Sequence, residues 1–344
     1  MRKVFIVILV LLLVAGAVSA ALVGLGYYLN SPVESGSTSS EGRESSFHVS
    51  PGEAVSVTAE RLADKGLIRS KYMFVALTKL RQTQSAIKSG YYYISARMTT
   101  VEIHNMLVTG TQRLVKVTLA EGLTARQIGA RFEEAGVTAQ DDFLDAIDSQ
   151  RVLSRFQMEI DSLEGYLYPD TYLFQEDYPA EQVVTHLVEA MFEKLHEIYP
   201  EYTQLEREEL HRKIILASIV EREYRDPEEA DKIASVFYNR MERGMRLQSC
   251  ATVVYVMTEI HGEDHPEKIT FNDLEIESKY NTYTEWGLPP APIANPGKVA
   301  LEAVFYPADT DSLYFLLKDP DAGQHVFTRN LNDHNRAYRL YIKQ

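Results

Sequence analysis

The chain has very little cysteine and tryptophan, and too little positive charge to balance its acids. Cys250 and Trp286 are its single cysteine and single tryptophan among 344 residues. One cysteine excludes an internal disulfide framework. Lysine and arginine together number 35 against 49 aspartates and glutamates, so the formal net charge is -14. Because nucleic acids and anionic lipid surfaces need basic patches to offset phosphate charge, we expect no nucleic-acid partner.

Metal ligands in a usable arrangement are also missing from the sequence. His261 and His265 have the spacing of a ligand pair. Gly262 and Pro266 predict a loop there, however, and no thiolate or carboxylate constellation joins the two histidines. We therefore expect neither a metal ion nor a cofactor. What the chain does have is 45% hydrophobic residues, enough for one long or two short folded domains.

One long uncharged run, residues 4–29, directly follows Arg2 and Lys3. As a helix this run would extend about 39 Å, more than the ~30 Å hydrocarbon core of a bilayer. Small residues at positions 17–20 also fit a cleaved signal peptide, but the apolar character continues to Leu25. We expect residues 1–30 to form a cytoplasmic N-terminus and an uncleaved transmembrane anchor in the inner (cytoplasmic) membrane. The basic N-terminus places the rest of the chain on the extracytoplasmic side.

Two segments follow the expected anchor. Residues 31–46 are rich in serine, glycine and glutamate with almost nothing apolar, so we expect a flexible linker. Residues 47–112 predict a small α+β module in which a strand, two helices and a second strand are followed by a helix that Gly110 closes. The order strand, helix, helix, strand between residues 48 and 95 resembles a LysM-like module, whose relatives bind glycan. A role in binding glycan and a role in orienting the rest of the chain both remain open.

A related pattern returns seventy positions later in the chain. Its matching positions are Gly52 with Gly122, Leu62 with Phe132, Gly66 with Gly136 and Leu67 with Val137. The second copy opens residues 113–344, which we expect to form a larger mixed α/β catalytic domain. The predicted fold class is therefore α+β, with an N-terminal transmembrane helix, a small LysM-like module and this larger domain.

Within the larger domain the periodicity predicts further elements. A strand is expected near 114–119, and helices over 124–135, over 180–199 and from 330 to about 342. A hairpin is expected around 319–323. Residues 252–255 favour a strand by propensity, although Ser249 also fits the N-cap of a helix.

A helix pattern from Lys213 to Tyr224 ends in a carboxylate. Ile214, Ala217 and Glu221 recur at i, i+3 and i+7, so one face is apolar for two turns and then carries Glu221. Partial burial raises the pKa of a carboxyl group toward the value that a general acid needs near neutral pH. The spacing also fits a solvated Glu221 paired with Arg225.

The helix after this one has a well-marked start. Asp226 is expected as its N-cap, Pro227 as its first residue and Glu229 at the third position of a capping box. Gly244 is expected to end it. The stop at Asp226 places Glu221 close to a helix end, and so at the rim of a cleft.

Five segments in fixed order carry a resemblance to a known family. They are residues 213–224, 233–240, 244–248, 280–283 and 287–290, the last reading Gly287-Leu288-Pro289-Pro290. Together they resemble the membrane-anchored endolytic murein transglycosylases, also called the MltG or YceG-like family. Glu164-Gly165-Tyr166 and the residues after it are similar to another segment of that family. The resemblance implies that Glu221 is the catalytic acid.

The resemblance also implies a substrate site. Asn281 and Asn295 lie in a proline-rich loop and offer amide groups for hydroxyl and acetamido groups, and Tyr283 or Trp286 offers a ring for a sugar face. Taken alone, the composition of the loop favours a rigid surface loop with satisfied amides, because proline-rich loops are common. The full set of expected substrate-binding residues is Glu223, Gln248, Thr252, Tyr280, Asn281, Tyr283, Asn295 and His325.

The chain departs from the family at Cys250 and Ala251, where members usually carry aspartate and proline. The departure argues against a catalytic carboxylate at this place. We expect Cys250 to be a small buried hydrophobic residue.

The resemblance implies cleavage of the β-1,4 bond between N-acetylmuramic acid and N-acetylglucosamine, with a 1,6-anhydro end. Glu221 would act first as acid and then as base, with glycan strands as substrate and membrane-bound murein synthases as partners. A hydrolytic muramidase is one alternative and needs a second carboxylate about 5–9.5 Å from the first, for which Glu223 is the local candidate. The other alternative is a non-catalytic anchored wall-binding protein.

Overall fold

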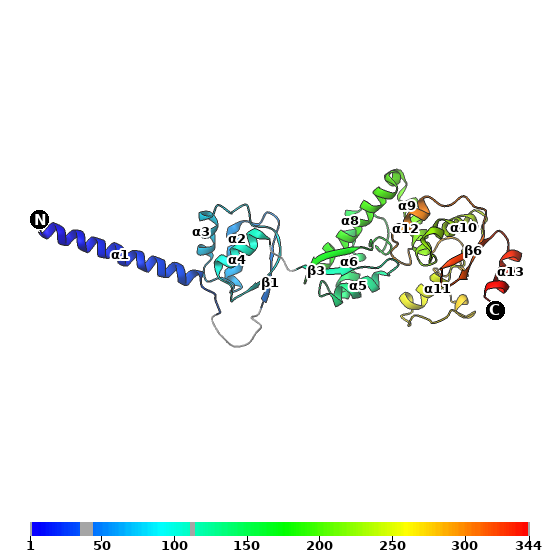
Figure 1. Ribbon diagram of the computed structural model, residues 1–344, viewed down its shortest axis with the longest axis horizontal. Helices are drawn as coiled ribbons and strands as arrows, with labels where there is room; N and C mark the ends of the chain where they lie inside the picture. Colours follow the sequence, from blue (N-terminus) through cyan, green and yellow to red (C-terminus); the bar gives the residue numbers. More distant parts are fainter. Residues whose placement is uncertain (1, 35–43, 111–113, 343–344) are drawn as a thin grey trace. The chain divides into compact units, whose positions relative to one another are not determined.

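The computed structural model describes residues 2–34, 44–110 and 114–342, and these form two compact units, Met1–Leu114 and Val115–Gln344 (Figure 1). The expected boundary between residues 112 and 113 lies outside the described residues. Helices and short two-stranded sheets alternate in both units, which confirms the α+β class.

The first unit begins with α1, Arg2–Asn30. Its segment Leu11–Asn30 has a mean hydropathy of 1.9 and lies exposed, and within the described residues it is the one helix long and apolar enough to cross a membrane. The C-terminal end of α1 is bonded to the folded module, since Asn30 Oδ1 accepts a hydrogen bond from the Val101 N–H at 3.0 Å.

The segment expected to be a flexible linker is ordered at both of its ends. Arg69 donates hydrogen bonds to the carbonyl oxygens of Pro32 and Val33, and strand β1 already begins at Glu44. The linker prediction was therefore wrong for residues 31–34 and 44–46. At the N-terminal end the cause is Arg69, a partly buried arginine whose side chain donates hydrogen bonds to several backbone carbonyls at once. Residues 35–43 lie outside the described part of the chain.

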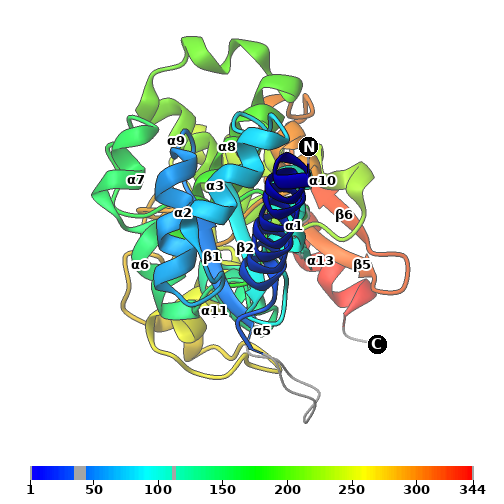
Figure 2. The ribbon, with the colours of Figure 1, turned by 90° about the vertical axis from the view of Figure 1, so that its left-hand side faces the viewer.

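The folded part of the first unit is a two-stranded sheet covered by helices (Figure 2). β1, Glu44–Val49, pairs antiparallel with β2, Gly90–Ser95, so that Phe47 lies opposite Tyr92. The helices are α2, Val55–Asp64, α3, Lys71–Leu80, and α4, Thr100–Thr109. One core joins the inward side chains of the strands to those of the helices. The order β1, α2, α3, β2 agrees with the predicted order of elements, while the likeness to LysM modules stays a prediction.

The second unit opens with the same arrangement. β3, Leu114–Thr118, is followed by α5, Ala125–Glu134, and α6, Gln140–Ile147, and pairs with β4, Thr171–Gln175. Gly122 has a φ of 74° where Gly52 has 75°, because both turns need a left-handed residue before the helix. The seventy-residue repeat is thus a structural repeat of two β-α-α-β modules, with α7, Gln150–Arg155, inserted in the second.

The central helix of the second unit is α9, Arg207–Glu221. Its neighbours are α10, Ala230–Glu242, and α12, Lys298–Phe305, and α12 also contacts α8, Ala180–Ile198. Residues 214–220 of α9 are buried all round, as expected for a helix at the centre of a domain. The prediction of α8 is confirmed.

The C-terminal part completes the unit with α11, Cys250–Tyr255, the hairpin of β5, Tyr314–Asp319, and β6, Gln324–Thr328, and α13, Leu331–Tyr341. Short turns are η1, Pro200–Gln204, η2, Pro227–Glu229, η3, Val256–Ile260, and η4, Asp273–Glu275. The predicted hairpin and last helix are confirmed. The segment after residue 249 is a helix and not the strand that propensity favoured.

The predicted capping box before α10 is wrong. Asp226 accepts a hydrogen bond from the Glu228 N–H at 3.0 Å and so caps the η2 turn, while α10 itself begins at Ala230. The Glu229 carboxylate instead accepts hydrogen bonds from the backbone N–H and the ring of His325 in β6. A partner from a distant strand has displaced the local contact that the sequence pattern suggested.

Candidate active site

Glu221 is the last residue of α9, and both of its carboxylate oxygens are held. Oε2 accepts a hydrogen bond from the Gly297 N–H at 2.9 Å, and Oε1 accepts one from the Tyr224 hydroxyl at 3.2 Å. The alternative pairing with Arg225 is therefore not the contact that positions this side chain. Glu221 is half-buried, as the sequence analysis expected of a residue at the end of an apolar helix face.

Burial is the main reason why the pKa of Glu221 rises from its ordinary 4.5 to about 7. The Gly297 N–H and the Tyr224 hydroxyl lower this pKa, because they stabilise the ionised form. The nearby Glu121 carboxylate raises it, and Arg222 lowers it by a smaller amount. The net result is a carboxyl group that is protonated for about half of the time at neutral pH, the condition that suits a general acid.

The loop before α12 supplies the N–H that holds Glu221. Gly297 is the N-cap of α12 with an extended backbone, so its own N–H is free to point away from the helix. The backbone of Asn295 bonds this loop to the turn before α5. The Asn295 N–H donates to the Leu123 carbonyl, and the Asn295 carbonyl accepts from the Gly122 N–H, each at 2.9 Å. The loop before α12 and the turn before α5 are thus joined by backbone hydrogen bonds, and the loop in turn holds Glu221.

Glu121 is a site residue that the sequence analysis missed. It lies beside Gly122 in the turn between β3 and α5, and its exposed carboxylate sits directly on Gly297, where a Cβ atom would overlap it. A Cβ atom at Gly122 would lie 3.4 Å from the Glu221 Cγ, an ordinary van der Waals contact. The repeat carries a signal for this residue, because it aligns Gly122 with the turn glycine Gly52 and Glu121 directly precedes Gly122.

Asn295 is buried and fully bonded inside the protein. Its amide nitrogen donates to Glu164 Oε1 at 2.7 Å and to the Leu123 carbonyl at 3.0 Å, and its Oδ1 accepts from the N–H groups of Gly165 and Leu167. No surface of this side chain is left for a sugar, since its exposed fraction is 0%. The expectation that Asn295 contacts substrate is thus wrong; it positions the loop.

Glu164 is the buried partner of Asn295. Both of its oxygens accept from the Ala125 N–H at the start of α5, each at 3.0 Å. Burial raises its pKa from 4.5 to about 8, against the lowering effect of those hydrogen bonds. Glu164 therefore ties the loop to the second β-α-α-β module as a mostly neutral group.

Asn281 and Thr252 are buried in the same manner. Asn281 donates to the carbonyls of Leu274 and Ile276 and accepts from the Tyr283 N–H, while the Thr252 hydroxyl bonds the Ser249 carbonyl and Thr282. Both side chains have an exposed fraction of 0%. The expected substrate contacts at these two positions are wrong for the same reason as at Asn295: their polar atoms hold the fold.

Glu223 points to the start of α11. Its Oε1 accepts a hydrogen bond from the Ser249 hydroxyl, and the Ala251 N–H also bonds the carboxylate. Burial raises its pKa, and these two hydrogen bonds lower it. The side chain is thus held by a helix N-terminus, which stabilises an anion.

Tyr280, Tyr283 and Gln248 keep exposed surface, as the partly exposed Glu223 also does. Tyr280 packs on Tyr255 with ring centroids 5.1 Å apart and remains partly exposed. Gln248 is exposed, with a left-handed φ of 51° that few side chains adopt. Tyr283 is partly exposed and its hydroxyl lies 3.1 Å from the Cys250 sulfur. These three stay proposals as substrate contacts.

Two other expectations change. Cys250 is exposed, so its prediction as a buried residue is wrong; it occupies the first turn of α11 and faces the Tyr283 hydroxyl. His325 is buried in the hairpin and its Nδ1 lies 2.9 Å from Glu229 Oε2. This contact gives His325 a structural part in joining β6 to the η2 turn.

A pocket of about 370 Å³ adjoins the site. It contains Arg222, the residue after Glu221, together with Ala251 of α11 and Thr124 of the turn before α5. Arg222 also donates to the Gly122 carbonyl at 3.0 Å, so the pocket wall and the support of Glu221 are continuous. Tyr255, Glu259 and Ile293 also line this pocket.

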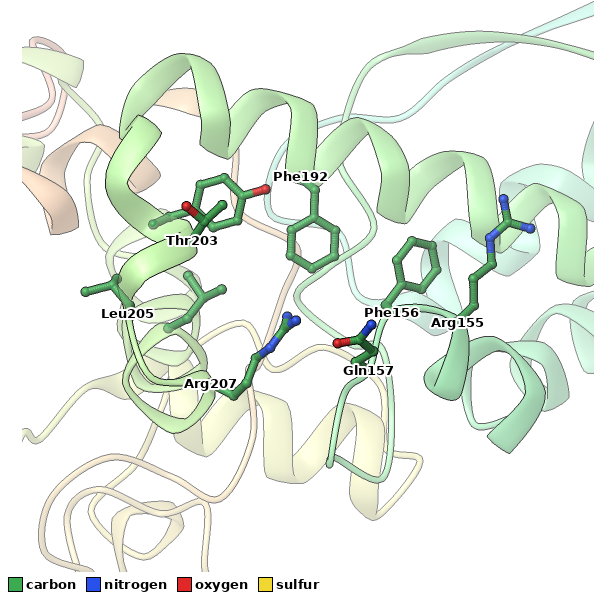
Figure 3. A pocket seen from close by; sticks show the side chains of 9 residues that line it. Arg155, Phe156, Gln157, Phe192, Thr203, Leu205 and Arg207 are labelled. Atoms are coloured by element: carbon green, nitrogen blue, oxygen red, sulfur yellow. The ribbon is translucent and has the colours of Figure 1, made fainter.

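A second pocket, of about 320 Å³, lies at the other end of α9 (Figure 3). Phe156 and Phe192 stack there with ring centroids 5.8 Å apart, and Arg207 opens α9 beside them. Arg207 and Glu221 are fourteen positions apart along this helix, which corresponds to about 21 Å. This pocket is therefore separate from the site at Glu221.

Comparison with known proteins decides the family. Residues 47–340 match the model of the YceG-like family. The chain belongs to this family. An endolytic murein transglycosylase of Bacillus subtilis is 31% identical over 312 residues, which cover 86% of this chain and 84% of the relative.

Two further comparisons agree with this assignment. An endolytic murein transglycosylase of Streptococcus pneumoniae strain D39 is 27% identical over 323 residues, covering 85% of this chain and 57% of the relative. A crystal structure of a YceG-like protein from Listeria monocytogenes is 32% identical, covers 86% of this chain and 99% of its own, and superposes with a TM-score of 0.57. The resemblance identified from the five sequence segments is thereby confirmed.

Proposed function

We propose that this protein is an endolytic lytic transglycosylase of peptidoglycan in which Glu221 is the general acid and then the general base. The observation that carries the proposal is the position of Glu221: a half-buried carboxyl group with a pKa of about 7, held at a helix end by Gly297 and Tyr224. The relatives named endolytic murein transglycosylases support the reaction class and the substrate.

The reaction requires one proton donor and no water. Glu221 donates its proton to the glycosidic oxygen as the β-1,4 bond between N-acetylmuramic acid and N-acetylglucosamine breaks. The 6-hydroxyl oxygen of the same muramic residue bonds to its anomeric carbon, and the hydroxyl proton passes to the Glu221 carboxylate. The products are a 1,6-anhydro end and a free 4-hydroxyl, and Glu221 ends in its starting form. Intramolecular attack gains from proximity over attack by water.

The anchor places this chemistry near a membrane. The exposed apolar helix α1 is long enough to cross a bilayer, and its end is bonded to the first unit. We propose that α1 anchors the chain in the cytoplasmic membrane with both folded units outside, acting on newly made glycan strands beside membrane-bound murein synthases. The basic residues at positions 2 and 3 support this orientation.

The hydrolytic alternative needs a second carboxylate that activates water. Glu223 was its local candidate, and its carboxylate is bound to Ser249 and to the Ala251 N–H. Those contacts direct it to the start of α11, a different place from the Gly297 and Tyr224 partners of Glu221. This arrangement argues against a hydrolytic reaction that depends on the pair Glu221 and Glu223.

The test is digestion of purified murein sacculi by the full-length protein in detergent, with mass spectrometry of the released fragments. We expect fragments with 1,6-anhydro ends, lighter by one water than those with reducing ends. Glu221→Gln should reduce release at least 1,000-fold while the thermal midpoint stays close to that of wild type. Glu133→Gln, at an exposed position of α5, is the control and should match wild type. Reducing ends would support the muramidase, and full release by Glu221→Gln would remove the assignment of Glu221.

A further inference from the structure

Glu121 and Glu221 face the same backbone group from two sides. The Gly297 N–H donates to Glu221 Oε2 at 2.9 Å, and the Glu121 carboxylate lies where a Gly297 side chain would be. Through these two contacts the nearest oxygens of the two carboxyl groups lie within roughly 7–8 Å of each other. The two groups come from different parts of the chain, Glu121 from the turn of the second β-α-α-β module and Glu221 from α9.

We infer that Glu121 is a second acidic group of the site, an electrostatic positioning residue that keeps the proton on Glu221 and stabilises the positive charge of the sugar as the glycosidic bond breaks. This inference rests on the proposed function and adds a residue and a role to it. It assigns Glu121 no bond to substrate and no proton transfer.

Glu121 is exposed and contributes one formal negative charge to the site. A half-buried neighbour behaves differently: burial and the Glu121 charge act in the same direction on Glu221 and favour its protonated form. The environment thus separates the two acids into one carboxylate and one proton donor.

The other charged or titratable groups near the site do not cancel the effect of the Glu121 charge on Glu221. Arg222 lies next to Glu221 and bonds the Gly122 carbonyl. Tyr224 donates to Glu221, and the Glu121 charge, after burial and Glu221 itself, also raises the pKa of the Tyr224 hydroxyl. On the Glu121 side, Tyr168 feels the same charge, which adds to the effect of its burial in raising its pKa. Lys298, the residue after Gly297, is 3.4 Å from Glu302 and so has its own acidic partner.

The second effect of Glu121 concerns the positive charge that develops on the sugar during the reaction. Departure of the leaving oxygen leaves an oxocarbenium-like sugar with positive charge near its anomeric carbon. The Glu121 carboxylate, which projects from the turn before α5 and lies against Gly297, stabilises that charge electrostatically. Glu121 does so from the side of Gly297, while the 6-hydroxyl group closes the ring.

The experiment compares Glu121→Gln with Glu121→Asp in the full-length protein. The amide removes the charge and keeps the shape, whereas aspartate keeps the charge. We expect Glu121→Gln to lower kcat about ten- to a hundred-fold with KM within about twofold. The alkaline limb of the pH–rate profile of Glu121→Gln should move to lower pH by about 0.5–1 unit, because the negative charge beside Glu221 has been removed. Glu121→Asp should retain most of kcat and leave the alkaline limb unchanged. Glu133→Gln should match wild type in kcat and in the position of the limb.

A measurement that needs no activity separates failure of this inference from failure of the proposed function. The titration of Glu221 can be followed by NMR with carboxyl-labelled glutamate, the resonance being assigned by its loss in Glu221→Gln. A titration midpoint that falls in Glu121→Gln and stays in Glu121→Asp supports the inference. If Glu121→Gln titrates and reacts as wild type does, or if Glu121→Asp loses as much as Glu121→Gln, the inference is overturned. An active Glu221→Gln would instead overturn the proposed function.

Discussion

At the scale of single residues, the proton on Glu221 is the property that the proposed reaction needs. Its pKa of about 7 results from burial at the end of α9, opposed by the Gly297 and Tyr224 hydrogen bonds. A fully exposed glutamate would be ionised at this pH, and a fully buried one without donors would hold its proton too tightly. The half-buried position lets the group serve as acid and then as base.

The first prediction concerns the pH dependence of fragment release. We expect kcat/KM to fall as pH rises above about 7, because the fraction of protonated Glu221 falls there. Rates measured from pH 5 to pH 9 on the same sacculi would show this limb. A rate that still rises between pH 7 and pH 9 would contradict the assignment of Glu221 as acid.

The second prediction concerns Asn295, whose amide makes four hydrogen bonds inside the protein. Asn295→Ala leaves the Glu164 carboxyl group and two backbone N–H groups without this partner, so we expect a loss of about 2–4 kcal/mol in the free energy of unfolding. Urea denaturation measures it. Asn272→Ala, at an exposed position, is the control and should change stability by less than about 0.5 kcal/mol. Equal stability of both variants would contradict the buried network.

At the scale of elements, the site is assembled from three chain segments with little local contact among them. α9 brings Glu221, the loop before α12 brings the Gly297 N–H, and the turn before α5 brings Glu121. Glu164 fastens the N-terminus of α5 to the loop through the Ala125 N–H and the Asn295 amide. Small displacements of these elements would therefore separate the groups that hold Glu221.

The third prediction tests the close approach at Gly297. Its φ of -86° suits any residue, so its need for glycine is a matter of space: a Cβ would overlap the Glu121 carboxylate. Gly297→Ala should lower the rate of fragment release about tenfold or more, since either Glu121 or the N–H bonded to Glu221 must move. Gly16→Ala, with nothing within 4 Å of the added atom, is the control and should keep the wild-type rate.

The fourth prediction concerns Glu164 and the stability of the second unit. Its pKa is about 8 in the folded chain against an ordinary 4.5, so the unfolded chain loses the proton first as pH rises. This group therefore favours the folded state fully below about pH 4.5, and that contribution is lost progressively up to about pH 8. Glu164→Gln should flatten the decline in the free energy of unfolding over this range. An unchanged decline in urea denaturation from pH 4.5 to pH 8 would contradict the assignment.

At the scale of the whole molecule, two β-α-α-β modules share one design and differ in their use. The first stands in the unit that α1 joins, and the second is built into the unit that carries Glu221. In the second, the turn before the first helix contributes Glu121 to the site. The first module keeps the matching turn glycine, Gly52, and its part in glycan binding stays a prediction.

The fifth prediction concerns the membrane topology of the full chain. If α1 spans the cytoplasmic membrane with its basic end inside, added protease should degrade both folded units in spheroplasts without lysing the cells. A cytoplasmic protein serves as the control and should stay intact until lysis. Protection of the folded units in intact spheroplasts would contradict the proposed orientation, and release into the medium would indicate a cleaved signal peptide.

The sequence by itself determined the elements whose cause is local. The periodicity of residues 180–199, the paired turn glycines of the repeat and the apolar face that ends at Glu221 depend on spacing along the chain, and the structure agrees with each. The family motifs also lie within short segments and were recognised directly.

Only the tertiary structure decided which polar groups face outward. Asn281, Asn295 and Thr252 have the chemistry of substrate contacts but are buried and bonded to distant backbone, and Cys250 is exposed although its type favours burial. Glu121 comes near Glu221, 100 positions away in sequence, because a turn and a loop pack together. Glu229 bonds His325 of a distant strand in place of a local helix cap. The spacing of residues along the chain determines which side chains share a face of one helix or strand. Which residues that face contacts is determined by packing between elements.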